Sequence, residues 1–169
     1  YVAYFHAQSP ADLEEALERL REQGMKALIV DLRFNPGGLL DTATELSDAF
    51  LSEGTIVSTR GRSSPEQVFS ADDESGDCTD IPLVVLVNEY SASASEILAG
   101  AIKDNGRGII VGEKTFGKGS VQTAVPLPDG RGALKLTTAR YYTPSGVCIE
   151  EVGVKPDISV PLSDEKDRK

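Results

Sequence analysis

The sequence has one histidine, two cysteines, one methionine and no tryptophan. A Ser–His–Asp triad would therefore depend on His6 alone, which stands in an apolar, strand-like run, and we expect His6 to be structural or exposed. Cys78 and Cys148 are too few and too far apart to predict a zinc site. The pattern leaves open whether these two cysteines form a disulfide or remain two thiols.

Basic residues and long apolar runs are also scarce. Seventeen basic residues against 27 acidic ones give a net charge of −10, which argues against a nucleic-acid surface. No apolar run approaches the roughly 20 residues that span a bilayer, and the longest, 81–87, suits a buried strand. We expect a solvated loop rather than a metal site at the acidic cluster, because no histidine accompanies Asp72, Asp73, Glu74 and Asp77.

What remains is the composition of a globular protein, with 40% apolar and 26% charged residues in a chain of 169. That length suffices for one domain with a substantial core. The chain opens at Tyr1 directly into an apolar run without methionine, so we expect a piece of a longer protein. We predict one core domain over 1–162 and a charged, frayed tail over 163–169.

Hydrophobic spacing alternates between helical and strand-like patterns along the chain. Helices are predicted over 9–23, 39–51 and 92–104, and strands over 26–33, 55–59, 82–87 and 108–111. A hairpin is predicted from 119–126 and 132–142 around Pro128-Asp129-Gly130, and a long exposed loop over 61–80. Alternating strands and helices predict an α/β domain with a largely parallel sheet covered by helices.

Two loops of unusual composition follow predicted buried strands, where parallel α/β folds place their ligands. One is the glycine-containing run 35–38, and the other is the serine-rich run 88–96 that leads into a helix. Backbone N–H groups at a helix N-terminus can stabilise a developing oxyanion. Gly37 and Gly38 would let a second backbone N–H approach the same point.

A serine hydroxyl needs a base to become a good nucleophile, and the known alternative to histidine is a desolvated, neutral lysine. Lys118 stands between two glycines with apolar neighbours, unlike the other lysines. If this segment is a strand, Gln122 shares the face of Lys118 and can hold its amine. The residues alone leave other interpretations open: 91–95 as a helix start of small residues, and 117–119 as a turn. The string Gly117–Ser120 lacks the glycine spacing of a phosphate-binding P-loop.

Five strings occur together in order, with spacing typical of one family. They are Asp31–Gly38, Ser91–Ile97 with Ala99–Ala101, Gly112–Gln122, Tyr142–Gly146 and Gly153–Asp157. In these strings the chain closely resembles the carboxyl-terminal processing proteases, also called tail-specific proteases, over roughly residues 10–160. The resemblance implies a crotonase-like, Clp-protease-like α/β core.

The resemblance also assigns roles to residues. It implies that Ser93 is the nucleophile, that Lys118 is the general base and that Gln122 orients the lysine. The backbone N–H of Ala94, with that of Gly37 or Gly38, would form the oxyanion hole.

The implied activity is that of a serine endopeptidase with a Ser–Lys dyad. It would cleave proteins or peptides bound by their C-terminal region, outside the cytoplasm in the periplasm or cell envelope, without metal or organic cofactor. Family members usually carry a PDZ domain before the core, which this sequence does not contain. The oligomeric state of the protein is left open by the sequence. The alternatives are a non-catalytic ligand- or peptide-binding module on the same fold, since fold alone does not decide function, and a structural subunit of a larger assembly.

Overall fold

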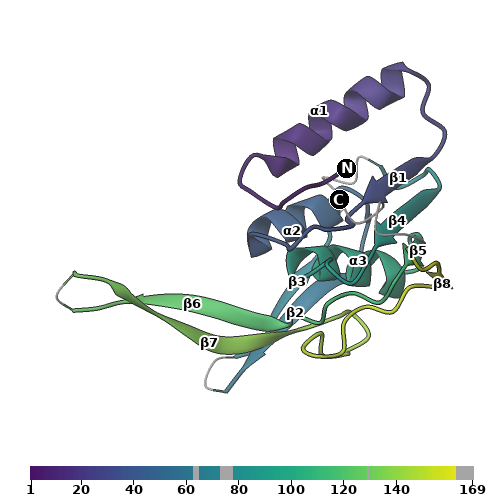
Figure 1. Ribbon diagram of the computed structural model, residues 1–169. Coiled ribbons are helices and arrows are strands. Elements are labelled where there is room, and N and C mark those ends of the chain that lie inside the picture. The colour runs from purple at the N-terminus through teal and green to yellow at the C-terminus, as the bar shows by residue number, and fades with distance from the viewer. Residues whose placement is uncertain (63–64, 73–77, 129, 163–169) are drawn as a thin grey trace.

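Two four-stranded sheets and three α-helices make up the structure, a computed structural model that describes residues 1–62, 65–72, 78–128 and 130–162 (Figure 1). The first sheet is entirely parallel, in the order β1 (Leu28–Asp31), β4 (Leu83–Val87), β5 (Ile109–Gly112) and β8 (Ile158–Ser159). Its central register aligns Val30, Val85 and Ile110, all at most 5% exposed. The aliphatic runs of the sequence form this buried row because both faces of a parallel sheet are covered.

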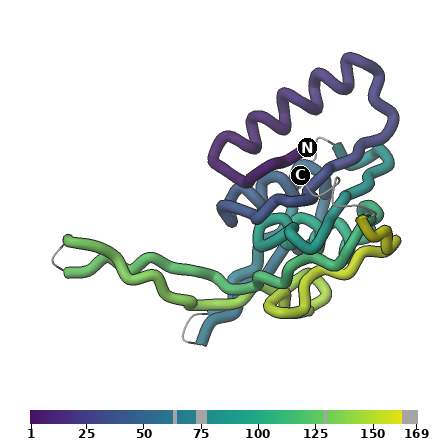
Figure 2. The backbone as a smooth tube through the Cα atoms, viewed as in Figure 1, coloured from purple at the N-terminus to yellow at the C-terminus, as the bar shows by residue number. Residues whose placement is uncertain are grey.

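The second sheet is antiparallel, in the order β3 (Gln67–Ser70), β2 (Thr55–Gly61), β7 (Ala133–Tyr142) and β6 (Ser120–Pro126). Strand β7 pairs with β2 only over its last residues, 139–142. The rest of β6 and β7 extends away from the body as a two-stranded arm (Figures 1 and 2).

The helices are α1 (Ser9–Glu22), α2 (Leu40–Asp48) and α3 (Ala94–Asp104). Helix α3 contacts α2, β5 of the parallel sheet and β2 of the antiparallel sheet, so it lies between the two sheets. Every residue of α3 from Ala94 to Ile102 is buried. The core therefore surrounds the helix that begins directly after Ser93.

The predicted α/β fold with a parallel sheet is confirmed, and most elements lie within a few residues of their predicted bounds. The exposed loop predicted over 61–80 is wrong for Gln67–Ser70, which pairs with β2 as strand β3. Its side chains are largely exposed, which explains the polar composition. Most of the acidic cluster, the hairpin residue Asp129 and the tail 163–169 lie outside the described residues. Within the described part of the chain, no helix is long and apolar enough to cross a membrane.

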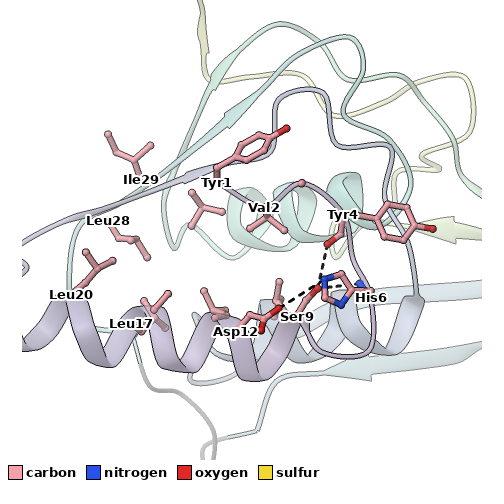
Figure 3. A pocket seen from close by; sticks show the side chains of 15 residues that line it. Tyr1, Val2, Tyr4, His6, Ser9, Asp12, Leu17, Leu20, Leu28 and Ile29 are labelled. Carbon is pink, nitrogen blue, oxygen red and sulfur yellow. Dashed lines mark hydrogen bonds and ion pairs between the residues drawn. The ribbon is translucent and has the colours of Figure 1, made fainter. Parts of the chain in front are cut away.

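An apolar cavity of about 390 Å³ separates α1 from β1 and the N-terminal segment (Figure 3). Its lining includes Leu13, Leu17 and Leu20 of the predicted helical stripe, and Leu28 and Ile29 of β1. Ile29 is 62% exposed because β1 is the edge strand of its sheet. None of the serines or lysines discussed below as catalytic candidates lines this cavity.

The short strand β8 is held at the other edge of the parallel sheet by Asp157. One carboxylate oxygen accepts from Lys103 Nζ at 2.5 Å, and the other accepts from the Ile110 backbone N–H at 2.9 Å. Partial burial alone raises the pKa of Asp157, but these hydrogen bonds and the charge of Lys103 outweigh it, so the pKa lies below its ordinary value. The ionised form therefore stabilises the fold.

Replacing Asp157 by Asn should lower the free energy of unfolding at neutral pH by about 0.5–1 kcal/mol, since the pair is partly exposed. In thermal unfolding this is a decrease in Tm of about 1–3 °C for a domain of this size. A folded pKa below the unfolded value means that the contribution is complete at neutral pH and is lost as pH falls through the folded pKa. The difference between wild type and variant should therefore shrink in acid. Asp80→Asn, at an exposed aspartate, is the control, and an equal effect of both substitutions at pH 7 would contradict the assignment.

Candidate active site

Three loops meet beyond the carboxyl ends of neighbouring parallel strands. We call them the glycine loop (35–38, after β1), the serine loop (88–93, after β4) and the lysine loop (113–119, after β5). The Ala92 N–H donates to the Asn35 carbonyl at 3.0 Å, which joins the serine loop to the glycine loop. The Phe116 N–H donates to the Ser91 carbonyl at 3.0 Å, which joins the lysine loop to the serine loop. The sheet thus brings together the segments that the sequence singled out.

The three neighbouring serines have different environments. The Ser91 hydroxyl donates to the Leu32 carbonyl at 2.8 Å, and the Ser95 hydroxyl donates to the Asn35 carbonyl at 3.0 Å. Both residues are completely buried. Ser93 is half-buried; its side chain accepts from the Glu96 backbone N–H in the capping box of α3, but its hydroxyl donates to no residue that the structure describes. Of the three, only Ser93 therefore has an accessible hydroxyl whose proton is not donated to a backbone carbonyl.

Ser93 also has an unusual backbone, with φ of 58° and ψ of −113°. A positive φ is uncommon for a residue other than glycine and costs on the order of 1–3 kcal/mol. Ser93 occupies the junction between the serine loop and α3. A sharp turn between a strand and a helix is the geometry that exposes the nucleophile in α/β hydrolases.

Backbone N–H groups of Ala94 and Gly38 have no acceptor among the residues that the structure describes. The Gly37 N–H, by contrast, donates to the Asn35 side-chain oxygen at 2.8 Å. Gly37 has φ of 101°, and a Cβ there would lie 2.8 Å from Ser93 Cβ and 2.6 Å from the Ala92 carbonyl oxygen. The glycine loop can approach the serine only without a side chain at this position.

The lysine loop is fixed through its glycines. A Cβ on Gly119 would lie 2.2 Å from the Glu150 backbone nitrogen, and one on Gly117, which has φ of 91°, would lie 3.1 Å from the Glu151 carbonyl carbon. The Gly117 carbonyl accepts from the Glu151 N–H at 2.8 Å. Lys118 between them is exposed, and in the described part of the chain its ammonium forms no hydrogen bond or ion pair, with Ser93 or with Gln122.

Gln122 lies in β6, whereas Lys118 precedes that strand, which begins at Ser120. A shift of register between Val121 and Gln122 further interrupts the alternation. The two residues therefore do not share one strand face, contrary to the simple strand pattern. The Gln122 carboxamide donates to the Thr137 hydroxyl at 2.6 Å.

Sequence reasoning did not single out Glu96, which is completely buried in the first turn of α3. One carboxylate oxygen accepts from the Ser93 and Lys118 backbone N–H groups, both at 2.8 Å. The other accepts from the Thr115 hydroxyl at 2.5 Å and the Gly117 N–H at 2.7 Å. One side chain thus binds the serine turn and the lysine loop together. A glutamate three residues after the helix cap was the available signal, since it completes a capping box.

At the end of β1, Asp31 forms a bidentate pair with Arg33, with the shortest contact at 2.7 Å. Partial burial of Asp31 raises its pKa, but hydrogen bonds from the Arg33 side chain and backbone dominate and hold the pKa below its ordinary value. The pair braces the strand end from which the glycine loop departs.

His6 takes no part in these contacts, as expected. It is exposed at the start of α1, where its Nδ1 accepts from the Gln8 N–H and its Nε2 lies 3.9 Å from an Asp12 oxygen (Figure 3). Cys78 and Cys148, both described, are not bonded to each other. The described residues contain no group of three or more His, Cys, Asp or Glu side chains arranged to hold a metal ion.

The carboxyl edge of the parallel sheet thus combines a strained serine turn, free backbone amides and a lysine loop. Residues 1–160 match the model of peptidase family S41. The chain is 50% identical over 161 residues to the carboxy-terminal-processing protease of Bartonella bacilliformis, covering 92% of this chain and 37% of that protein. It is 46% identical over 157 residues to the carboxyl-terminal-processing protease of Picosynechococcus sp., covering 93% and 37%.

The fold agrees with these matches. The photosystem II D1 C-terminal processing protease superposes with a TM-score of 0.88 at 42% identity, covering 95% of this chain and 41% of that structure. The chain belongs to peptidase family S41, which confirms the resemblance read from its five strings. It spans a little over a third of the length of the curated relatives described above.

Replacing Glu96 by Gln should loosen the lysine loop, because the amide nitrogen that replaces one carboxylate oxygen cannot accept the two hydrogen bonds that this oxygen accepts. We expect a loss of about 1–3 kcal/mol in the free energy of unfolding, since buried N–H groups are left unsatisfied. Faster amide hydrogen exchange at Gly117 and Lys118 is the specific readout. Glu89→Gln, at an exposed residue of the serine loop, is the matched control. Unchanged exchange at both amides would show that Glu96 does not hold the loop.

Proposed function

We propose that this chain carries the catalytic core of a serine endopeptidase, in which Ser93 is the nucleophile and Lys118 the general base. One observation carries the proposal: of three clustered serines, only Ser93 has an accessible hydroxyl that donates to no described residue, and it lies on a strained turn beside uncommitted backbone amides. Family membership supports the same residue.

In the proposed reaction, Ser93 Oγ attacks the carbonyl carbon of the scissile peptide bond while the neutral Lys118 amine takes the hydroxyl proton. The N–H groups of Ala94 and Gly38 stabilise the oxyanion of the tetrahedral intermediate. Collapse breaks the C–N bond, and Lys118 returns its proton to the leaving amine. Water, activated by the same amine, then hydrolyses the acyl-enzyme and frees Ser93. For the second oxyanion donor, Gly38 is favoured over Gly37, whose N–H is already occupied.

The proposed reaction requires that the exposed Lys118 side chain become buried. A lysine accepts a proton only in its neutral form, which burial favours and solvent exposure does not. We propose that bound substrate, or parts of the protein outside this chain, cover Lys118 and bring it to Ser93. Gln122 would hold the lysine through its side-chain oxygen, which accepts from the amine while the amide nitrogen keeps its hydrogen bond to Thr137.

For the whole protein we propose cleavage of proteins near their C-termini, bound by their C-terminal region. The support is the naming of the relatives as processing proteases. We propose a location outside the cytoplasm, a core over residues 1–162, a PDZ domain elsewhere in the protein and no cofactor, on the same family basis. A binding module without catalysis is disfavoured, because strain at Ser93 would then serve no purpose.

Ser93→Ala and Lys118→Ala in the full-length protein should each reduce cleavage of an unfolded protein substrate at least 1,000-fold, since removal of a catalytic group of such a dyad costs this much or more. The measurement is initial rates of cleavage by mass spectrometry, with folding checked by circular dichroism. Ser52→Ala and Lys114→Ala, the latter in the same loop, are matched controls. Near-normal activity of Lys118→Ala would refute the dyad.

A further inference from the structure

Asn35 in the glycine loop is completely buried, and each of its polar atoms forms a hydrogen bond. Its side-chain nitrogen donates to the Val2 carbonyl at 2.7 Å, and its side-chain oxygen accepts from the Gly37 N–H at 2.8 Å. Its backbone carbonyl accepts from the Ala92 N–H and the Ser95 hydroxyl, both at 3.0 Å. Asn35 therefore joins the N-terminal segment, the glycine loop, the serine loop and helix α3.

The N-terminal segment, residues 2–5, runs alongside the glycine loop. The Phe5 N–H donates to the Gly37 carbonyl, and the Leu39 N–H donates to the Phe5 carbonyl, both at 3.0 Å. In a planar trans peptide group the C=O and the N–H point in opposite directions. Because the Gly37 carbonyl points toward Phe5, the Gly38 N–H of the same peptide group points away from Phe5.

The peptide group between Gly37 and Gly38 has little preference of its own for this direction. The two residues have φ of 101° and 156°, and glycine adopts positive and negative φ about equally readily. Hydrogen bonds to neighbouring segments therefore decide where the Gly38 N–H points. The Asn35 side chain supplies two of them, since it holds the Gly37 N–H and also holds Val2 in the segment that carries Phe5.

The other free amide, that of Ala94, depends on the same residue. The Asn35 carbonyl holds Ala92 and Ser95, which flank Ala94 on either side. The glycine loop adjoins this amide, since a Cβ on Gly37 would lie 2.8 Å from the Ala94 nitrogen. Donors of an oxyanion hole are most effective when they are fixed in place before the reaction. Asn35 forms contacts that fix both donors.

We propose that Asn35 is a positioning residue, which fixes the N–H groups of Ala94 and Gly38 in the direction that an oxyanion requires. The inference rests on the function proposed above. Asn35 acts through the backbone that it holds and not on the substrate. Its loss should therefore weaken an interaction that is strongest in the transition state, and should leave substrate binding in the ground state unchanged.

The test measures cleavage of an unfolded protein substrate by the full-length protein over a range of substrate concentrations. Asn35→Ala should lower kcat about 100-fold, as loss of one oxyanion donor costs about 100–1,000-fold, while KM stays the same. A peptide aldehyde that ends at the residue preceding the cleaved bond forms a tetrahedral adduct with the serine. Its inhibition constant should rise by the factor by which kcat/KM falls.

Asn35→Asp provides a second measurement that does not depend on a truncated side chain. A protonated aspartic acid has the donor and the acceptor of asparagine, whereas the carboxylate has no donor for Val2 and places a negative charge beside the proposed oxyanion. The ratio of kcat for this variant to kcat for the wild type, measured at the same pH, should therefore rise as pH falls. A ratio that is constant or falls toward acid would contradict the positioning role.

Asn105→Ala is the matched control. The Asn105 side chain also forms two hydrogen bonds, donating to the Thr55 carbonyl at 2.9 Å and to the Ala101 carbonyl at 2.8 Å, but it lies at the other end of α3 from Ser93. This substitution should lower the Tm and leave kcat and the aldehyde inhibition constant unchanged. A merely structural role of Asn35 predicts the same result for Asn35→Ala.

Failure of the positioning role and failure of the proposed function give different results. If the wild type cleaves the substrate and Asn35→Ala retains kcat within about threefold, or loses activity through KM instead, the positioning role is wrong and the proposed peptidase stands. An equal loss of kcat in Asn105→Ala would also refute the role. If the wild type neither cleaves protein nor binds the aldehyde, the proposed function fails and the positioning role fails with it.

Discussion

The buried carboxylate of Glu96 is the contact on which the geometry of the site depends. It accepts four hydrogen bonds, from the backbone of the serine turn and from three groups of the lysine loop. Hydrogen bonds to a charged acceptor are stronger than neutral ones, and a buried carboxylate is tolerable only when it is satisfied in this way. The position of Lys118 relative to Ser93 thus follows from one side chain in the first turn of the most buried helix.

The same arrangement explains how the fold maintains strain at Ser93. A residue with positive φ persists only where its surroundings determine its position. Here the Asn35 carbonyl holds Ala92 and Ser95 on either side, and Glu96 holds the Ser93 N–H itself. Gly37 closes the remaining side without a side chain. These contacts hold the Ser93 hydroxyl in an accessible position and leave the N–H groups of Ala94 and Gly38 without an acceptor among the described residues.

Patterns in the sequence predicted much of this. Aliphatic runs predicted the strands of the parallel sheet, and the rule for ligand sites in α/β folds selected loops that the structure brings together. Spacing alone could not distinguish Ser93 from Ser91 and Ser95, because their difference lies in long-range hydrogen bonds to Leu32 and Asn35. Strand β3 was missed because its faces are largely solvated, and the role of Glu96 because its three partners in the lysine loop stand 19 to 22 residues away. The alternation that joined Gln122 to Lys118 failed because β6 begins between them.

Covalent labelling of the full-length protein with a fluorophosphonate, followed by peptide mapping, tests the central claim most directly. The reagent reacts only with a serine that is both accessible and activated. If Ser93 and Lys118 form the dyad, one adduct should form, on Ser93, and Lys118→Ala should lose it while Lys114→Ala keeps it. An adduct on Ser91 or Ser95, or equal labelling of Ser93 without Lys118, would contradict the account.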